Sequence, residues 1–496
     1  MASTHQEPIL QTKVIGTSEF AVNANIAIDL EKPLDKILAI SSASDVTGTE
    51  SVDTDYSIMG KTQINVVYLS TSGVIESVNG VCEWQNTAKV IGENKSAKVN
   101  VVECSVERFS ASEVVINVLQ NAIISGTTAS ELASLPELDD SYIIDKKEVR
   151  INQPIAFGAD KFVVADNTEV AVASAEVISC EPTVVVKNVV SGIDQVTVEG
   201  EIDLKLTYNS EGNYYAITKK VDFRQEVACL HALPGAAASA IVSVASVTAT
   251  AEIGEKTNFM VAIGLNVNAT SYGEVVLDLA RDMFSLTKQI TTTTQCVDCL
   301  TYSGSKNYTD TFSCVASIDT VGVDEVIGSI CPSVNIAKSI VEDGKLTIEG
   351  VLSCTLLYKD NAQESVASLP ISCPFVSSVD CDFGTSIESL AVGGNVASVK
   401  VRAGKEAEVV FDISVQANIC NSTYFEYIAS VTEGEDRLPD ESAITIYVTK
   451  QGETMFEVAR ALGVDPAAIA SQNQTESDTF EAGRRIFVYN PLNVQF

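Results

Sequence analysis

The clearest spacing for chemistry in the sequence is a C-x-x-C pair, Cys296 and Cys299, within "TTTTQCVDCLTYS". Such a pair can contribute to a zinc site, but a structural zinc ion normally needs four ligands. No second pair and no flanking histidine accompany it, so it is only a weak metal candidate, and we expect neither a metal nor a cofactor. The other ten cysteines are spread singly, mostly in alternating apolar runs, where we expect buried free thiols rather than disulfides.

Residues suited to acid–base or nucleophilic catalysis are scarce. The two histidines, His5 and His231, lie outside any zinc-protease or catalytic-triad motif. The neighbouring carboxylates Asp139 and Asp140 occur in "PELDDS", which is typical of a solvated turn rather than of a general acid and base. No phosphate-binding loop of the form G-x-x-x-x-G-K occurs. The sequence therefore predicts a protein that is not an enzyme.

The charge of the chain restricts its partners. Sixty-six acidic residues against 32 basic ones give a net charge of −34, which argues against binding to nucleic acid or anionic lipid. The N-terminus "MASTHQEPILQTKVIG" lacks the basic region and apolar core of a signal peptide. The longest uncharged stretch, 227–251, contains Pro234 and alternates from Ile241, which favours a strand over a membrane span. We expect a cytoplasmic protein with no signal peptide and no transmembrane segment.

Three segments of the chain share one register. Each has an apolar pair, then a glycine, then a tyrosine eight residues after the glycine, and finally a large aromatic residue. The members are Ile37-Leu38, Gly60, Tyr68 and Trp84; Val177-Ile178, Gly200, Tyr208 and Phe223; and Val326-Ile327, Gly350, Tyr358 and Phe375. The copies begin about 140–150 residues apart, which suits one domain each and is too long for a solenoid repeat.

The local pattern of these copies predicts strands. Apolar residues alternate between the glycine and the tyrosine, which indicates a half-buried strand. A polar turn follows ("STSG", "NSEG" or "KDNA"), and a second strand ends at the aromatic residue, as in a hairpin. Long alternating runs come next, so each unit is predicted to be an antiparallel sandwich or barrel. We expect the glycine to mark a bulge or bend where the strand begins, and the tyrosine to pack in the core.

The chain is therefore expected to be mainly β, with three tandem units followed by a small domain. The predicted limits are 1–150, 151–302 and 303–432 for the units, 433–443 for an acidic linker and 444–496 for the last domain. The stretch 431–443, "VTEGEDRLPDESA", holds six charges with little to bury, which is typical of a flexible tether.

The last domain shows the signals of two helices between two strands. After a short strand at 444–448, Thr454 suits a helix N-cap, and Glu457 three residues later completes a capping box. Gly463 supplies a left-handed stop, and Asp465 with Pro466 begins a second helix. Gly483 then leads into the closing strand "RRIFVY". The resulting βααβ unit has a very small core.

The three units resemble the SPOCS domain family of spore-forming Firmicutes. The resemblance is carried by the G-x7-Y strand, by the preceding "DKIL", "AEVIS" and "DEVIG" elements, and by the aromatic strand end, which is complete as Pro374-Phe375. It covers about residues 10–430.

Residues 444–491 resemble a LysM module, through "YVTKQGETMFEVARALGV", "AIASQN" and "EAGRRIFVY". In that family, glycan N-acetyl groups lie in a groove between the loop that enters the first helix and the loop that leaves the second. By position, the groove residues here are Gly452, Glu453, Thr454, Met455, Gln472, Asn473, Gln474 and Thr475. The second loop departs from the family pattern because it continues with Glu476 and Asp478, where a sugar platform needs apolar faces.

Tandem SPOCS units followed by a LysM module resemble spore morphogenesis proteins of clostridia. The resemblance implies a non-enzymatic scaffold or adaptor in spore envelope (coat and cortex) morphogenesis, in the mother cell at the forespore surface. In that family the LysM module docks onto the spore coat morphogenetic ATPase, so this ATPase or another coat-base protein is the expected partner. Two alternatives stay open: a wall or cortex protein that binds peptidoglycan through N-acetylglucosamine, and a self-assembling surface or filament subunit.

Overall fold

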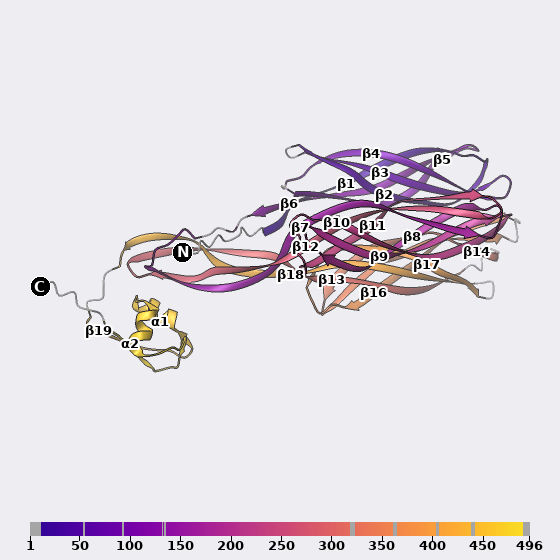
Figure 1. Cartoon of the computed structure of the whole chain (residues 1–496). Coiled ribbons are helices and arrows are strands. Elements are labelled where there is room, and N and C mark those ends of the chain that lie inside the picture. The colour runs from indigo at the N-terminus through magenta and orange to yellow at the C-terminus, as the bar shows by residue number, and fades with distance from the viewer. Residues whose placement is uncertain are drawn as a thin grey trace.

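A computed structural model describes residues 11–52, 55–91, 94–130, 132, 135–317, 323–360, 365–402, 406–437 and 442–489. Long antiparallel strands form almost all of this part of the chain, and the short helices α1 and α2 lie near the C-terminus (Figure 1). The prediction of a mainly β protein that ends in a βααβ module is confirmed.

The first unit consists of two three-stranded antiparallel sheets, with strand orders β1-β6-β5 and β2-β3-β4. Its strands are β1 (Gln11–Asp29), β2 (Leu34–Val52), β3 (Asp55–Ser70), β4 (Ile75–Lys89), β5 (Asn94–Phe109) and β6 (Glu113–Ser130).

The second and third units repeat this order strand for strand, with sheets β11-β12-β7 and β10-β9-β8, then β13-β18-β17 and β14-β15-β16. The strands of the second unit are β7 (Tyr142–Val170), β8 (Glu176–Ser191), β9 (Gln195–Ser210), β10 (Asn213–Ala228), β11 (Ala237–Ile253) and β12 (Thr257–Ser285). Those of the third are β13 (Lys288–Ser317), β14 (Val323–Glu342), β15 (Lys345–Asp360), β16 (Ser365–Asp380), β17 (Ser386–Arg402) and β18 (Glu406–Asp436). The tandem repeat inferred from a few shared sequence positions is therefore also a repeat of strand order.

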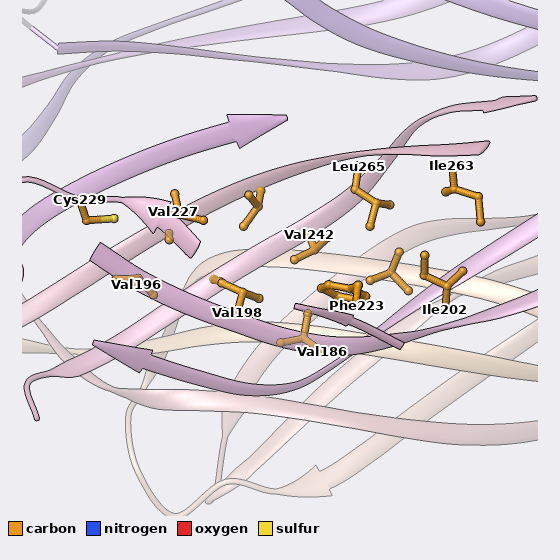
Figure 2. Packing of buried hydrophobic residues seen from close by; sticks show 14 of the residues in the cluster. Val186, Val196, Val198, Ile202, Phe223, Val227, Cys229, Val242, Ile263 and Leu265 are labelled. Carbon is orange, nitrogen blue, oxygen red and sulfur yellow. The ribbon is translucent and has the colours of Figure 1, made fainter. Parts of the chain in front are cut away.

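Each unit is a sandwich, because alternate residues of its two sheets point into one shared core. In the second unit, Val198 and Phe223 from one sheet meet Ile263 and Leu265 from the other, as Figure 2 shows. Equivalent cores fill the first and third units. The alternation read from the sequence therefore predicted the buried face of these strands correctly.

The repeated glycine makes room for the repeated aromatic residue. Gly60 pairs with Trp84, Gly200 with Phe223 and Gly350 with Phe375. A Cβ atom at any of these glycines would lie within 2.9 Å of the facing ring. The glycine lies inside β3, β9 or β15, and the accompanying bulge is on the neighbouring strand. The expectation of a bulge or bend at the strand start was wrong, because cross-strand packing sets this position.

The apolar pair and the tyrosine form a second feature that recurs in the three units. The first member of each pair lies opposite the tyrosine, and the second is an unpaired bulge residue. The bulge residues Leu38, Ile178 and Ile327 meet in one apolar cluster that all three units share. The tyrosines themselves are buried, as predicted. The bulges therefore turn side chains out of each sandwich and into the junction between units.

The strands continue through the predicted domain limits. β7 passes 150/151, β13 passes 302/303, and β18 extends into the predicted linker. We propose units at 11–130, 142–285 and 288–436. Residues 438–441, the middle of the linker, lie outside the described residues.

Four strands of the second and third units extend well beyond the sandwiches. β7 and β12 have 29 residues each, β13 has 30 and β18 has 31, whereas β1 and β6 have 19 and 18. The pairs β7–β12 and β13–β18 project together as a two-ribbon stalk (Figure 1). Apolar residues such as Ile151, Leu277, Val297 and Phe425 pack between the ribbons. About ten extra residues at about 3.3 Å each give the stalk a reach of roughly 33 Å.

The expectation of free thiols throughout was wrong at one pair. Cys314 of β13 and Cys373 of β16 form a disulfide, with Cα atoms 6.1 Å apart. They come from facing sheets of the third sandwich, at a separation that disulfide geometry accommodates. Pairing across a sandwich depends on tertiary structure, so singly spaced cysteines gave no sign of it.

The C-terminal module contains β19 (Ile444–Val448), β20 (Glu453–Thr454), α1 (Met455–Leu462), α2 (Pro466–Asn473), β21 (Thr479–Phe480) and β22 (Arg485–Tyr489). The sheet β19–β22 is antiparallel, and the helices pack on one of its faces through Val458, Ile469 and Ile486. Among the described residues, no helix meets the length and hydropathy needed to span a bilayer.

Candidate binding site

The loop that enters α1 is held by its own side chains. Thr454 caps the helix, accepting from the Glu457 N–H at 3.2 Å, while the Glu457 carboxylate accepts from the Thr454 N–H at 2.7 Å. This backbone hydrogen bond is the main reason that the pKa of Glu457 is lowered. Gly463 ends the helix in the left-handed conformation. The predicted capping box and stop are confirmed.

Glu453 stabilises the turn before the helix. Its carboxylate accepts from the Tyr447 hydroxyl at 2.6 Å and from the Lys450 N–H at 2.8 Å. The hydrogen bond to Glu453 raises the pKa of Tyr447. Gly452 completes the turn at φ 77°, a conformation that favours glycine. Glu453 and Thr454 are therefore committed to local structure.

The side chains at the end of α2 close one edge of the terminal sheet. The Asn473 amide accepts from the Phe487 N–H and donates to the Phe487 carbonyl, both at 2.7 Å. Gln472 makes the same pair of bonds with Tyr489, at 2.8 and 3.3 Å. Two side-chain amides thus take the place of a neighbouring strand along β22. Neither amide is left to point into a ligand groove.

The two predicted groove loops do lie together. The Met455 N–H donates to the Asp478 carbonyl at 2.9 Å, and the Gly452 N–H donates to the Phe480 carbonyl at 2.9 Å. Of the second loop, Thr475 is buried and Gln474 is exposed in the left-handed conformation. The exposed side chains that follow include Glu476 and Asp478. The structure brings the predicted segments together but offers carboxylates at their surface.

The outer side of α1 contacts the tip of the stalk. The rings of Phe456 and Phe284 lie 5.4 Å apart, and Arg460 forms an ion pair with Asp282. Next to this contact, the Arg437 N–H donates to the Thr287 carbonyl at 2.7 Å. Sequence reasoning missed this contact surface, since nothing local marks Phe284 as the neighbour of a helix some 170 residues later.

The cysteine, aspartate and histidine residues considered for metal binding or catalysis do not gather in one site. Cys296 is exposed and Cys299 is buried, because residues three apart on a strand point to opposite faces. The two thiols therefore do not converge on one site, and the described residues contain no group of three potential metal ligands. Asp139 accepts from the Ser141 N–H at 2.9 Å, as a turn residue does. His231 lies in a turn, and His5 lies outside the described residues.

Two regions of the chain match known domain families. Residues 175–252 match the SipL, SPOCS domain model, and residues 447–488 match the LysM domain model. This chain carries a SPOCS domain and a LysM domain. The expected SPOCS and LysM architecture is confirmed in these regions, and the first and third units share the strand order of the matched one. No curated protein and no solved structure matches the chain significantly.

The two domain families agree in what they indicate. Both are binding or scaffolding domains without a catalytic activity of their own. SPOCS domains indicate a role related to sporulation, and LysM is a family of peptidoglycan-binding type.

Proposed function

We propose that the protein is a non-enzymatic adaptor in spore coat and cortex assembly. In this proposal it works in the mother-cell cytoplasm, and its LysM domain docks onto the coat morphogenetic ATPase or another coat-base protein at the forespore surface. In this proposal the LysM domain binds protein rather than glycan.

This proposal is supported by the hydrogen bonds that the groove side chains already make within the LysM domain. A sugar site needs hydrogen-bonding side chains that are free to orient a ligand, beside apolar or aromatic faces. Here Gln472 and Asn473 are each bonded twice to β22, and Glu453 and Thr454 are used in the turn and cap. The remaining exposed surface includes Glu476 and Asp478. Such a surface is poorly suited to stacking against sugar rings.

The three SPOCS units support an adaptor role through their shape. Their shared apolar junction makes one body of three sandwiches, and the stalk carries the LysM domain beyond it (Figure 1). The stalk's reach exceeds the Debye length of about 8–10 Å at physiological salt, so it separates LysM from much of the body's negative charge.

The test compares the full chain with a truncation after Arg437, which keeps β18 intact. In sporulating cells, the full chain should co-purify with the coat ATPase and surround the forespore, while the truncation should lose both properties. Purified full-length protein should not be retained by purified sacculi. Equal capture of the ATPase by both chains would contradict the proposal.

Peptidoglycan binding is the second candidate, favoured by the LysM match and by the contact between the two loops. Saturable retention on sacculi that disappears with the truncation would establish it. The neutralised variant Glu476→Gln with Asp478→Asn should then bind sacculi more tightly, because it removes the carboxylates from the groove rim.

A further inference from the structure

The terminal sheet β19–β22 is apolar on both faces, although the helices cover only one. Its inner face contributes Ile486 and Val488, which are buried under α1 and α2. Its outer face carries Ile444, Ile446, Val448 and Tyr489, which are 54%, 56%, 58% and 52% exposed. A two-layer domain normally alternates apolar and polar residues along such strands. The outer face therefore has the apolar composition of a surface that a binding partner covers.

The two edges of this sheet differ. The β22 edge is closed by the amides of Gln472 and Asn473, as described above. On β19, the Thr449 N–H that follows the strand donates to the Arg484 carbonyl at 3.0 Å, so the main chain of Thr449 faces β22. Main-chain direction alternates along a strand, so the N–H and C=O groups of Ile444, Ile446 and Val448 point away from β22. In the described part of the chain, β19 pairs with β22 alone.

We propose that the open edge of β19 and the apolar outer face accept an extended segment of a partner protein as a third strand. A peptide backbone repeats its donors and acceptors at the spacing of the β19 edge, and its alternate side chains would cover Ile446 and Tyr489. This inference rests on the proposed function, because it requires the LysM domain to engage protein.

The positive charge at one end of the sheet indicates which side chains the partner segment should carry. Arg485 is exposed and pairs with Val448, so it lies on the outer face beside the apolar residues. Lys450 is exposed in the turn that follows β19. The partner segment should therefore combine alternating apolar residues with a carboxylate at the end that meets Arg485. A second copy of this chain is a poorer occupant, since two chains of charge −34 repel each other.

Photocrosslinking in the full chain tests this surface in sporulating cells. A photoreactive phenylalanine analogue replaces Tyr489, whose side chain lies on the outer face, and in a matched control it replaces Gln474 at the groove. Mass spectrometry maps the crosslinked residues. The expected result is one short segment of one protein, crosslinked from position 489 at roughly tenfold or more the yield from position 474.

Two variants, built into the chain with the photoreactive group at 489, probe the two parts of the surface. Ile446→Pro removes an N–H from the open edge while leaving the bonds to β22 in place, and Arg485→Glu reverses the charge. Each should reduce crosslinking by about tenfold, the effect of roughly 1.4 kcal/mol. Protection of the α1 amides from hydrogen exchange reports whether the module stays folded. If Ile446→Pro disturbs that fold, the crosslinking yield of Arg485→Glu alone tests the inference.

Several results would overturn the inference: crosslinks mainly from 474, crosslinks to glycan or to a second, differently tagged copy of this chain, no crosslink from 489, or no response to Arg485→Glu. The proposed function fails separately. If the segment mapped from 489 belongs to a protein outside the coat base, the third-strand inference stands and the proposed partner is wrong.

Discussion

At the residue scale, the most informative positions are the glycines that lie under aromatic rings. Gly200 is enclosed on two sides, because a Cβ atom there would lie 2.5 Å from both the Phe223 ring and the Val185 carbonyl oxygen. The ring could shift, but the backbone oxygen belongs to the neighbouring strand β8 and cannot easily move. The repeated glycine is thus required by packing rather than by backbone conformation.

Replacing Gly200 with alanine should lower the free energy of unfolding by about 1–3 kcal/mol, the usual cost of overpacking a core. The measurement is the shift in the denaturation midpoint of the full chain. Gly328→Ala is the matched control, because a Cβ atom there meets nothing within 4 Å. Equal midpoints for the two variants would show that the aromatic ring does not require a glycine beneath it.

At the element scale, the C-terminal module depends on short-range hydrogen bonds more than on a large core. α1 and α2 have eight residues each, too short to be stable by themselves in water. The capping box on α1 and the Gln472 and Asn473 amides on β22 hold these elements in place. These bonds explain how so small a unit keeps a defined fold.

Because the pKa of Glu457 is lowered in the folded state, its ionised form stabilises α1. That stabilisation is present above the ordinary carboxyl pKa of about 4.5 and is lost as the pH falls through the lower folded value. Glu457→Gln should therefore weaken the protection of α1 amides at pH 7 and make it less sensitive to acid between pH 5 and pH 3. Hydrogen exchange of both proteins across this range is the check. Parallel pH profiles would refute a role for the ionised cap.

At the scale of the whole molecule, three sandwiches, a stalk and the LysM domain form one connected arrangement. The LysM domain contacts the stalk through Phe456 and Phe284 and through the ion pair of Arg460 with Asp282. An exposed ion pair contributes little, about 0–1 kcal/mol, so the aromatic contact should dominate. The acidic linker that joins β18 to the LysM domain stays a prediction, because residues 438–441 lie outside the described residues.

Phe284→Ala should release the LysM domain from the stalk without unfolding it, because Phe284 belongs to β12. We expect faster hydrogen exchange at the stalk tip and a larger radius of gyration in small-angle scattering. Leu300→Ala, at an exposed stalk position, is the control and should change neither quantity. An unchanged scattering profile for Phe284→Ala would mean that the aromatic pair does not hold the domain.

The sequence by itself determined the features whose causes are local. Strand alternation, the hairpin turns and the capping box of Thr454 and Glu457 each depend on residues close together in the chain, so reading them in order was sufficient. The threefold recurrence of glycine, tyrosine and aromatic residues also fixed the number of units correctly, because each unit repeats the same packing.

Only the tertiary structure decided which residues meet across strands. In each unit, a large aromatic residue lies over a glycine of the neighbouring strand. Cys314 pairs with Cys373 across the third sandwich, and one bulge residue from each unit packs into a shared junction. The amides of Gln472 and Asn473 close one edge of the terminal sheet. The tertiary structure also extended four strands into a stalk, and three of them, β7, β13 and β18, run across the predicted domain limits. These outcomes depend on contacts between residues far apart in the chain, and local spacing carries no record of such contacts.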